Sequence, residues 1–505
     1  MKPPPPNIVL ITTDQQRCDS LAAYGATFTR TPGTSRLAVE GVVCARAYCT
    51  NPVCTPSRAS IFSGQYLSRH GAWNVGTSVP EDAIMLGHRL ATAGYRTHSV
   101  GKIHFQPHGS PKGTSLESIR DWKDHYPAFR GPYYGFETLE TALGHTEFGI
   151  NGHYGVWVRE QVGEEGVARL NTMERHSRFY FGGEAYDWNL PTRLHNSVWT
   201  ADRSIAFLRE HARARPFFLS IGFQDPHHPH CLPTDYPGRI SPESVPMPRF
   251  APGELDDKPP HFLAAHHGRL KADGIQGTYM VAGQGSGGNF AAVTPDEARL
   301  GRAYYYSMCK LLDEQLARVL EALDVEGLAE NTIVIFTTDH GELLGDHGLW
   351  MKGPFHYEEL VRIPLIVRWP AGLPAGRRVP GLVSHVDLVP TILAATGQPL
   401  TTELDGVNAL PLLRGDSESV RDAAIVECTD DPAGLRLKTI VTRDQKLTVY
   451  LGRNEGEFYD LRADPGELHN LWDNPVYTGD RERLLRRLID HAEPLERRAP
   501  RQSYA

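Results

Sequence analysis

The sequence predicts an α/β fold: a large sandwich in which helices flank a central, mostly parallel mixed sheet, followed by a smaller C-terminal domain with an antiparallel sheet. Three observations predict it. Short β-branched apolar runs recur at residues 8–11 and 333–336, and such runs are typical of buried strands. Between them, residues 201–212 and 311–323 repeat apolar residues at three- and four-residue steps, which indicates helices. The composition then changes after Gly397, which indicates a second unit.

The predicted strands end in residues that carry chemistry. Each of the two β-branched runs leads through two threonines to an aspartate, Asp14 in the first and Asp339 in the second. A third apolar run, at 217–223, leads to His227. Ligands of α/β sheets bind beyond the carboxyl ends of the strands. We therefore expect Asp14, His227 and Asp339 to lie together.

Two regions lack a clear period. Residues 106–196 are rich in Gly, Tyr, Trp, His and charge, which favours long, variable loops around the mouth of a substrate pocket. The Gly-rich residues 282–289 favour a flexible loop. The aromatic side chains of the longer region either line an apolar pocket or pack against one another; they are Trp122, Tyr133, Tyr134 and Trp157.

The C-terminal part has a different pattern. Residues 437–441 and 446–451 are typical of antiparallel strands, and residues 480–491 of a polar helix. This organisation predicts a catalytic α/β domain over residues 1–415 and a smaller α+β domain over residues 416–505.

Composition excludes several classes of protein. The 505 residues carry a net charge of −8, and the absence of a long basic run argues against nucleic-acid or anionic-membrane binding. No apolar run reaches the roughly 18 residues of a spanning helix, and the first residues lack the pattern of a signal peptide. With seven cysteines, an odd number, the chain is expected to be cytoplasmic and free of disulfides.

The most specific motif lies at residues 54–58, which are Cys-Thr-Pro-Ser-Arg and are followed by Ala-Ser-Ile-Phe-Ser-Gly. It resembles the maturation sequence of the formylglycine-dependent sulfatases of the alkaline phosphatase superfamily. The resemblance covers nearly the whole chain and implies that a maturase oxidises Cys54 to formylglycine. One hydroxyl of the hydrated aldehyde would attack sulfur, and the other would later expel sulfate. Arg58, one helical turn later, would support the hydrate. The alternative for Cys54 is an ordinary buried thiol.

The family also implies a divalent cation. Asp14 and Asp339 match its two strand-end aspartates, and Gln15, His340 and the oxygens formed from Cys54 would complete the ligands. A lone aspartate that caps a helix is the alternative. The commonest sulfatase pattern has paired aspartates and Asp-Asn, whereas Asp-Gln and Asp-His resemble choline sulfatases and phosphonate monoester hydrolases. Imidazole nitrogen suits Mn²⁺ better than Ca²⁺, so both cations remain open.

Further groups must hold the anion and the leaving oxygen. By the same resemblance, Lys102 binds the sulfate and the hydrate, and His104 is the base that takes a proton from the second hydroxyl. His227 and Lys352 would bind the sulfate and stabilise the leaving oxygen. Asn74 resembles an asparagine that contacts the sulfate or phosphonate oxygens in the nearest relatives, although a turn asparagine is an equal alternative.

These observations predict a sulfatase that hydrolyses an aryl, choline-like or sugar sulfate monoester. A phosphonate monoester or phosphodiester hydrolase with the same formylglycine is the alternative. A third hypothesis is a metal-binding protein in which Cys54 stays a thiol. The expected partners are a small-molecule or saccharide sulfate ester and the formylglycine-generating maturase, and the resemblance is compatible with a homodimer or homotetramer.

Overall fold

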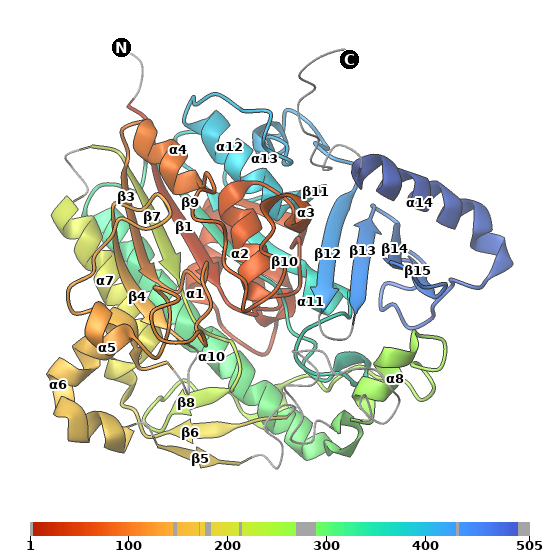
Figure 1. The fold of residues 1–505 in the computed structure, drawn as a ribbon, viewed down its shortest axis with the longest axis horizontal. Helices are drawn as coiled ribbons and strands as arrows, with labels where there is room; N and C mark the ends of the chain where they lie inside the picture. The colour runs from red at the N-terminus through yellow and green to blue at the C-terminus, as the bar shows by residue number, and fades with distance from the viewer. Residues whose placement is uncertain are drawn as a thin grey trace.

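The computed structural model describes residues 4–144, 149–170, 172–176, 183–211, 215–268, 289–430 and 434–492 (Figure 1). Its centre is an eight-stranded sheet in which β10 is antiparallel to both neighbours and the other pairs are parallel. The mostly parallel mixed sheet is thus confirmed. From edge to edge the strands are β11 (Arg377–Ser384), β2 (Val42–Tyr48), β10 (Arg362–Arg368), β9 (Thr332–Thr338), β1 (Asn7–Thr13), β7 (Phe217–Gly222), β3 (Arg96–Gly101) and β4 (Thr138–Leu143).

Helices cover both faces of this sheet, so its central strands are apolar on both sides. In β1, Ile8 and Leu10 pack into one core, and Val9 and Ile11 into the other. The helices on the first side include α2 (Cys54–Ser63), α4 (Leu86–Thr92), α12 (Leu388–Ala395) and α13 (Leu410–Arg414). Those on the second side include α1 (Pro32–Glu40), α6 (Gly152–Leu170), α7 (Asn196–His211) and α10 (Pro295–Val325).

The helix predicted at 311–323 is longer than its apolar period indicates. Thr294 and Glu297 form a capping box ahead of α10, with Pro295 at the first helical position, and this combination starts a helix well. The remaining short helices are α3 (Leu67–His70), α5 (Trp122–His125), α8 (Pro260–His266) and α11 (Glu358–Val361).

The interpretation of residues 106–196 as long loops is wrong for much of that region. β4 extends the large sheet at its edge, and α6 packs on β4. Strands β5 (Met173–Arg175) and β6 (Tyr186–Trp188) join β8 (Cys231–Pro233) in a three-stranded sheet. Several glycines and charges interrupt the apolar period of α6, and its helical state depends on packing rather than on local pattern.

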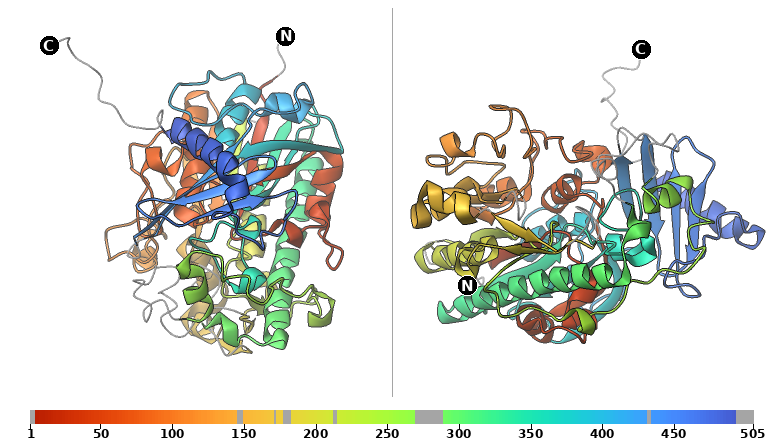
Figure 2. Two further views of the ribbon diagram at one scale, coloured as in Figure 1. Left: turned by 90° about the vertical axis from the view of Figure 1, so that its right-hand side faces the viewer. Right: turned by 90° about the horizontal axis from the view of Figure 1, so that it is seen from below.

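A second, antiparallel sheet lies to one side of the large one (Figures 1 and 2). One face packs under α14 (Thr478–Ala492) through Ile440, Leu447 and Leu484. The other face contributes to the core of the large sheet. The four strands are β12 (Ala424–Asp430), β13 (Leu435–Val441), β14 (Gln445–Tyr450) and β15 (Gly456–Asp460). The predicted antiparallel sheet is confirmed, while the domain division at residues 415/416 stays a prediction.

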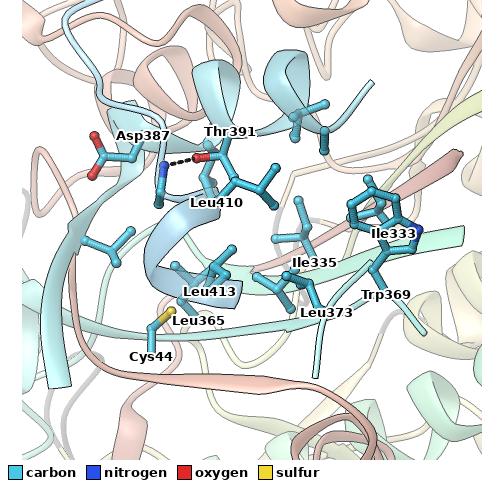
Figure 3. Close-up of a pocket in the computed structure, with 16 residues that line it drawn as sticks. Cys44, Ile333, Ile335, Leu365, Trp369, Leu373, Asp387, Thr391, Leu410 and Leu413 are labelled. Atoms are coloured by element: carbon cyan, nitrogen blue, oxygen red, sulfur yellow. Dashed lines mark hydrogen bonds between the residues drawn. The ribbon is translucent and has the colours of Figure 1, made fainter. Parts of the chain in front are cut away.

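A small apolar cavity of about 20 Å³ lies between the large sheet and helices α12 and α13 (Figure 3). Leu365, Trp369 and Leu410 are among its lining residues. Thr391, which also lines it, accepts a hydrogen bond from the backbone N–H of Ala409. An apolar cavity of this size offers nothing to an anionic ester, so the candidate site lies elsewhere.

All seven cysteines are free in this structure. Among the described helices, none has both the length and the apolar character that a membrane crossing needs. The flexible loop predicted at 282–289 lies outside the described residues except for Asn289.

Candidate active site and metal centre

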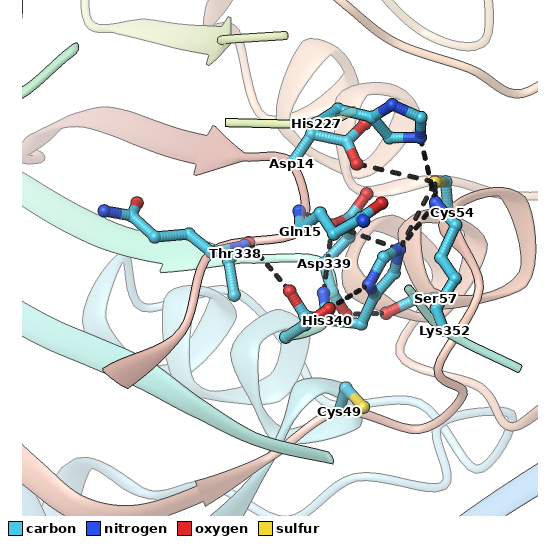
Figure 4. Close-up of polar contacts among 12 residues, drawn as sticks. Asp14, Gln15, Cys49, Cys54, Ser57, His227, Thr338, Asp339, His340 and Lys352 are labelled. Atoms are coloured by element: carbon cyan, nitrogen blue, oxygen red, sulfur yellow. Dashed lines mark hydrogen bonds and ion pairs between the residues drawn. The ribbon is translucent and has the colours of Figure 1, made fainter. Parts of the chain in front are cut away.

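Cys54 is the first residue of α2 and is buried. Its Sγ lies 3.0 Å from Lys352 Nζ, 3.3 Å from His340 Nε2 and 3.5 Å from Asp14 Oδ1 (Figure 4). Burial raises the pKa of the Cys54 thiol to about 11, and Asp14 adds to this, while Lys352 and Lys102 oppose it. An unmodified thiol here is therefore protonated near neutral pH and is a poor nucleophile.

Four potential metal ligands meet around this cysteine. One ligand atom from each of Asp14, Cys54, Asp339 and His340 lies within 4.8 Å of the others, and all four residues are buried. β1 and β9 are parallel neighbours with Thr13 opposite Thr338, so the aspartates that follow them come out side by side. Neither aspartate begins a helix, which removes the helix-cap alternative.

Gln15 offers a further oxygen. Its backbone is left-handed, with φ of 65°, and its N–H donates to Asp339 Oδ1 at 3.0 Å. The side-chain Nε2 donates to Glu342. The amide oxygen is buried and has no hydrogen-bond partner among the residues that the structure describes. A buried oxygen in this state fits a cation ligand.

His340 is held in the form that can bind a metal. Its Nδ1 donates to the carbonyl of Gly341 at 2.8 Å, so the lone pair of Nε2 faces Cys54. Burial lowers the pKa of His340 to about 4, which keeps the ring neutral. The donor set of carboxylates, one amide oxygen and one imidazole fits a divalent cation.

Two buried cations lie beside the aspartates. Arg58, one turn after Cys54, donates through Nε to Asp339 Oδ2 at 2.8 Å and lies 3.4 Å from Asp14 Oδ2. Lys102, directly after β3, forms an ion pair with Asp14. Because Arg58 bonds both carboxylates, it fixes their relative position.

Lys352 and His227 form the other cationic part of the site. Lys352 Nζ lies 3.0 Å from His227 Nε2. His227 Nδ1 must donate to the carbonyl of His228, 2.5 Å away, since a carbonyl only accepts. Burial lowers the pKa of Lys352, but its electrostatic interactions with Cys54, Asp14 and Asp339 outweigh burial and raise the pKa above its usual value. Lys352 is therefore an ammonium.

His104 and Asn74 are held by residues from other parts of the chain. The ring of His104 stacks on that of His108 with centroids 4.0 Å apart, and the backbone N–H of His104 donates to Glu117 Oε2 at 2.8 Å. The amide of Asn74 donates to the carbonyl of Thr429 at 3.3 Å. The roles of both residues toward the substrate stay predictions.

The chain is matched by a family model described as sulfatase over residues 6–398, and by one described as N-sulphoglucosamine sulphohydrolase, C-terminal, over residues 345–493. The chain belongs to the sulfatase family.

Relatives cover nearly the whole of this sulfatase. It is 30% identical over 502 residues to an uncharacterized sulfatase, YidJ, of Escherichia coli strain K12, with 99% of this chain and 89% of the relative covered. It is 27% identical to an arylsulfatase of Clostridium perfringens, with 97% and 95% covered. The crystal structure of a phosphonate monoester hydrolase of Agrobacterium radiobacter is 25% identical and superposes with a TM-score of 0.77, with 97% of this chain and 96% of that one covered. Family and relatives identify a sulfuric ester hydrolase.

The sequence left open whether four aromatic side chains line a pocket or pack against one another. In this sulfatase most of them are packed. Trp122, Tyr133 and Tyr134 are buried. The hydroxyl of Tyr133 donates to Glu117 at 2.7 Å, and that of Tyr134 to the carbonyl of Val79 at 2.5 Å. Both rings therefore pack in the protein interior.

Sequence reasoning missed the residues that support the site. Ser57 Oγ donates to the carbonyl of Asp339 at 2.6 Å, and His385 lies 3.1 Å from the same hydroxyl. Glu117 accepts the backbone N–H groups of residues 104–106. Glu342 holds Gln15. Ser57 lies inside the motif at residues 54–58, and Glu342 lies three residues after the predicted ligand Asp339, so both had a signal, whereas Glu117 lies in a region without one.

Proposed function

We propose that this sulfatase hydrolyses the S–O bond of a sulfate monoester with a formylglycine made from Cys54 and one divalent cation. The observation that carries the proposal is the position of Cys54 Sγ, within 3.5 Å of Asp14, His340 and Lys352. The sulfur stands in for the oxygens of the formylglycine hydrate, one of which is the nucleophile. These oxygens would contact both the metal ligands and a cationic side chain.

The cation would be held by Asp14, Gln15, Asp339 and His340 together with the formylglycine oxygens. When bound, it neutralises the charge of the ester and favours deprotonation of the attacking hydroxyl. The imidazole ligand favours Mn²⁺, and the carboxylates also accept Ca²⁺.

The side chains of this chain would bind the anion and move its protons. Arg58 keeps the two aspartates in place, and Lys102 offers an ammonium to the sulfate oxygens. Lys352 would give a proton to the leaving oxygen, since it is an ammonium held by His227 Nε2. His104 is proposed as the base that takes the proton of the second hydroxyl, and Asn74 as a further contact of the substrate.

The substrate is proposed to be an aryl, choline-like or sugar sulfate. The similarity to the phosphonate monoester hydrolase supports a second candidate, a phosphonate monoester or phosphodiester. Both esters present a tetrahedral anion to the same cations. Comparison of kcat/KM for 4-nitrophenyl sulfate and an aryl phosphonate monoester, each with Mn²⁺ and with Ca²⁺, tests the choice. A phosphonate preference of orders of magnitude would overturn the sulfate assignment.

The modification itself is tested by mass spectrometry after co-expression with a formylglycine-generating maturase. Conversion lowers the mass of the tryptic peptide with Cys54 by about 18 mass units. A Cys54→Ser variant is the matched control. An intact thiol in protein co-expressed with the maturase would contradict the covalent mechanism.

A further inference from the structure

Glu342 is a buried carboxylate three residues after Asp339, and it lies outside the four-residue metal-capable group. Both of its oxygens are engaged. Oε2 accepts from the side-chain amide of Gln15. Oε1 accepts from the backbone N–H groups of Leu344 at 2.9 Å and Met351 at 2.5 Å. Glu342 therefore connects the residue that follows β1 and Asp14 to its own loop, which continues to Met351.

The first consequence concerns the orientation of Gln15. Glu342 Oε1 is occupied by two backbone N–H groups, and Oε2 accepts from the NH₂ end of the Gln15 amide. The oxygen end must then point the other way, where it is buried without a hydrogen-bond partner in the described part of the structure. The backbone of Gln15 is held as well, because its carbonyl accepts from Tyr305 at 2.8 Å.

The second consequence concerns Lys352. Glu342 Oε1 bonds the N–H of Met351, the residue before Lys352. Met351 is itself left-handed, with φ of 69°, a conformation that is costly without such support. One carboxylate thus ties the loop that carries Lys352 to the strand end that carries Gln15.

We propose that Glu342 is a positioning residue that turns the Gln15 amide oxygen toward the cation and so sets the affinity and selectivity of the metal site. This inference rests on the proposed function in one respect, the presence of a cation between these ligands. Partners that orient a ligand typically change metal affinity by about 10–100-fold when they are replaced.

The test exploits the chemical difference between a carboxylate and an amide. In Glu342→Gln, the new side chain must still offer its oxygen to Leu344 and Met351, so its NH₂ faces Gln15. The Gln15 amide then has to turn over and present NH₂ to the cation. Mn²⁺ affinity, measured on chelator-stripped full-length protein by competition with a metal indicator, should fall about 10–100-fold.

A second variant separates orientation from general damage. In the double variant Gln15→Glu with Glu342→Gln, the carboxylate introduced at position 15 accepts from the amide introduced at position 342 and keeps its other oxygen for the cation. Mn²⁺ affinity should return to within a few-fold of the wild type, and Ca²⁺ should gain more than Mn²⁺ because a charged oxygen ligand is added. Glu457→Gln, which replaces a buried carboxylate bonded to Tyr450 and Tyr459, should leave both affinities unchanged.

The outcomes are distinguishable. Wild-type affinity in Glu342→Gln, or a double variant no better than the single one, would overturn the role of Glu342. Wild-type protein that binds Mn²⁺ but cleaves no sulfate ester would overturn the proposed function but not the positioning role of Glu342. Failure of the wild type to bind either cation would overturn both.

Discussion

Lys352 is the residue of the candidate site whose proposed role depends most directly on its charge. It is buried, positively charged and within 3.0 Å of both Cys54 Sγ and His227 Nε2. A leaving oxygen of low acidity needs a proton or a nearby cation, whereas a nitrophenolate leaves without help. The importance of Lys352 should therefore depend on the leaving group.

We predict that Lys352→Ala lowers kcat/KM by about 10²–10³ for an alkyl sulfate and by about 10-fold or less for 4-nitrophenyl sulfate. His227→Ala should show the same trend, because it orients the lysine. Lys310→Ala, on α10, is the control. Equal losses across a series of leaving groups would contradict the assignment of both residues.

Arg58 is fully buried between two carboxylates. Removal of one partner from a buried ionic network leaves the other charges unpaired, at a cost of about 3–5 kcal/mol. Because Arg58 also belongs to the motif at residues 54–58, whose modification is proposed, activity does not isolate this effect, whereas stability does.

Arg58→Ala should lower the free energy of unfolding in urea by about 3–5 kcal/mol, and Mn²⁺ should stabilise this variant more than the wild type. Arg318→Ala removes an exposed ion pair with Asp202 and should cost less than about 1 kcal/mol. An Arg58→Ala protein as stable as the Arg318→Ala protein would refute the buried network.

At the scale of elements, the end of β3 shows how a strand positions a side chain of the candidate site. Gly101 ends the strand with φ of +89°, and a Cβ there would lie 2.0 Å from the carbonyl oxygen of Gly222. The two strands can approach this closely only because both residues are glycine. Lys102 follows directly and reaches Asp14.

Gly101→Ala should therefore destabilise the fold by at least about 1–3 kcal/mol and lower kcat/KM by displacing Lys102. Gly94→Ala is a matched control, because Gly94 has a similar φ of +87° but no atom within 4 Å of the place that a Cβ would take. It isolates backbone strain from the clash. If the two variants behave alike, close packing of β3 on β7 is not what places Lys102.

At the scale of the whole molecule, His347 joins distant segments through a buried ionic bridge. Its Nδ1 lies 2.5 Å from Glu254 Oε1, and its Nε2 lies 3.2 Å from Glu359 Oε2. Burial lowers the pKa of His347, but the hydrogen bonds and charges of the two glutamates outweigh it and raise the pKa to about 9. The bridge therefore stabilises the fold only while the histidine is charged.

Since the folded pKa lies above the ordinary 6.5, this contribution is complete below about pH 6.5 and is lost as pH rises through about 9. We predict that the stability difference between wild type and His347→Gln shrinks by about 3 kcal/mol between pH 6.5 and pH 10. Urea unfolding of both proteins across this range measures it. A difference independent of pH would show that His347 contributes only by packing.

Much of the fold and of the chemistry follows from the sequence alone. The strands that lead to Asp14 and Asp339 are short, continuous apolar runs. Such a local pattern predicts a buried parallel strand without information from the rest of the chain. The segment from Cys54 to Arg58 is also local, because its spacing places both side chains on one side of α2. These features could be predicted since each depends on neighbours in the chain.

Only the tertiary structure decided the rest. β4 pairs with β3, and α6 packs on the sheet. These tertiary contacts stabilise both elements, whereas their weak local sequence patterns had indicated loops. Glutamate usually lies at the protein surface, yet Glu117 and Glu342 are buried. Each accepts hydrogen bonds from donors elsewhere in the chain. The cost of burying a carboxylate is offset only by partners that folding brings together, and the identity of those partners is not encoded in any short stretch of sequence.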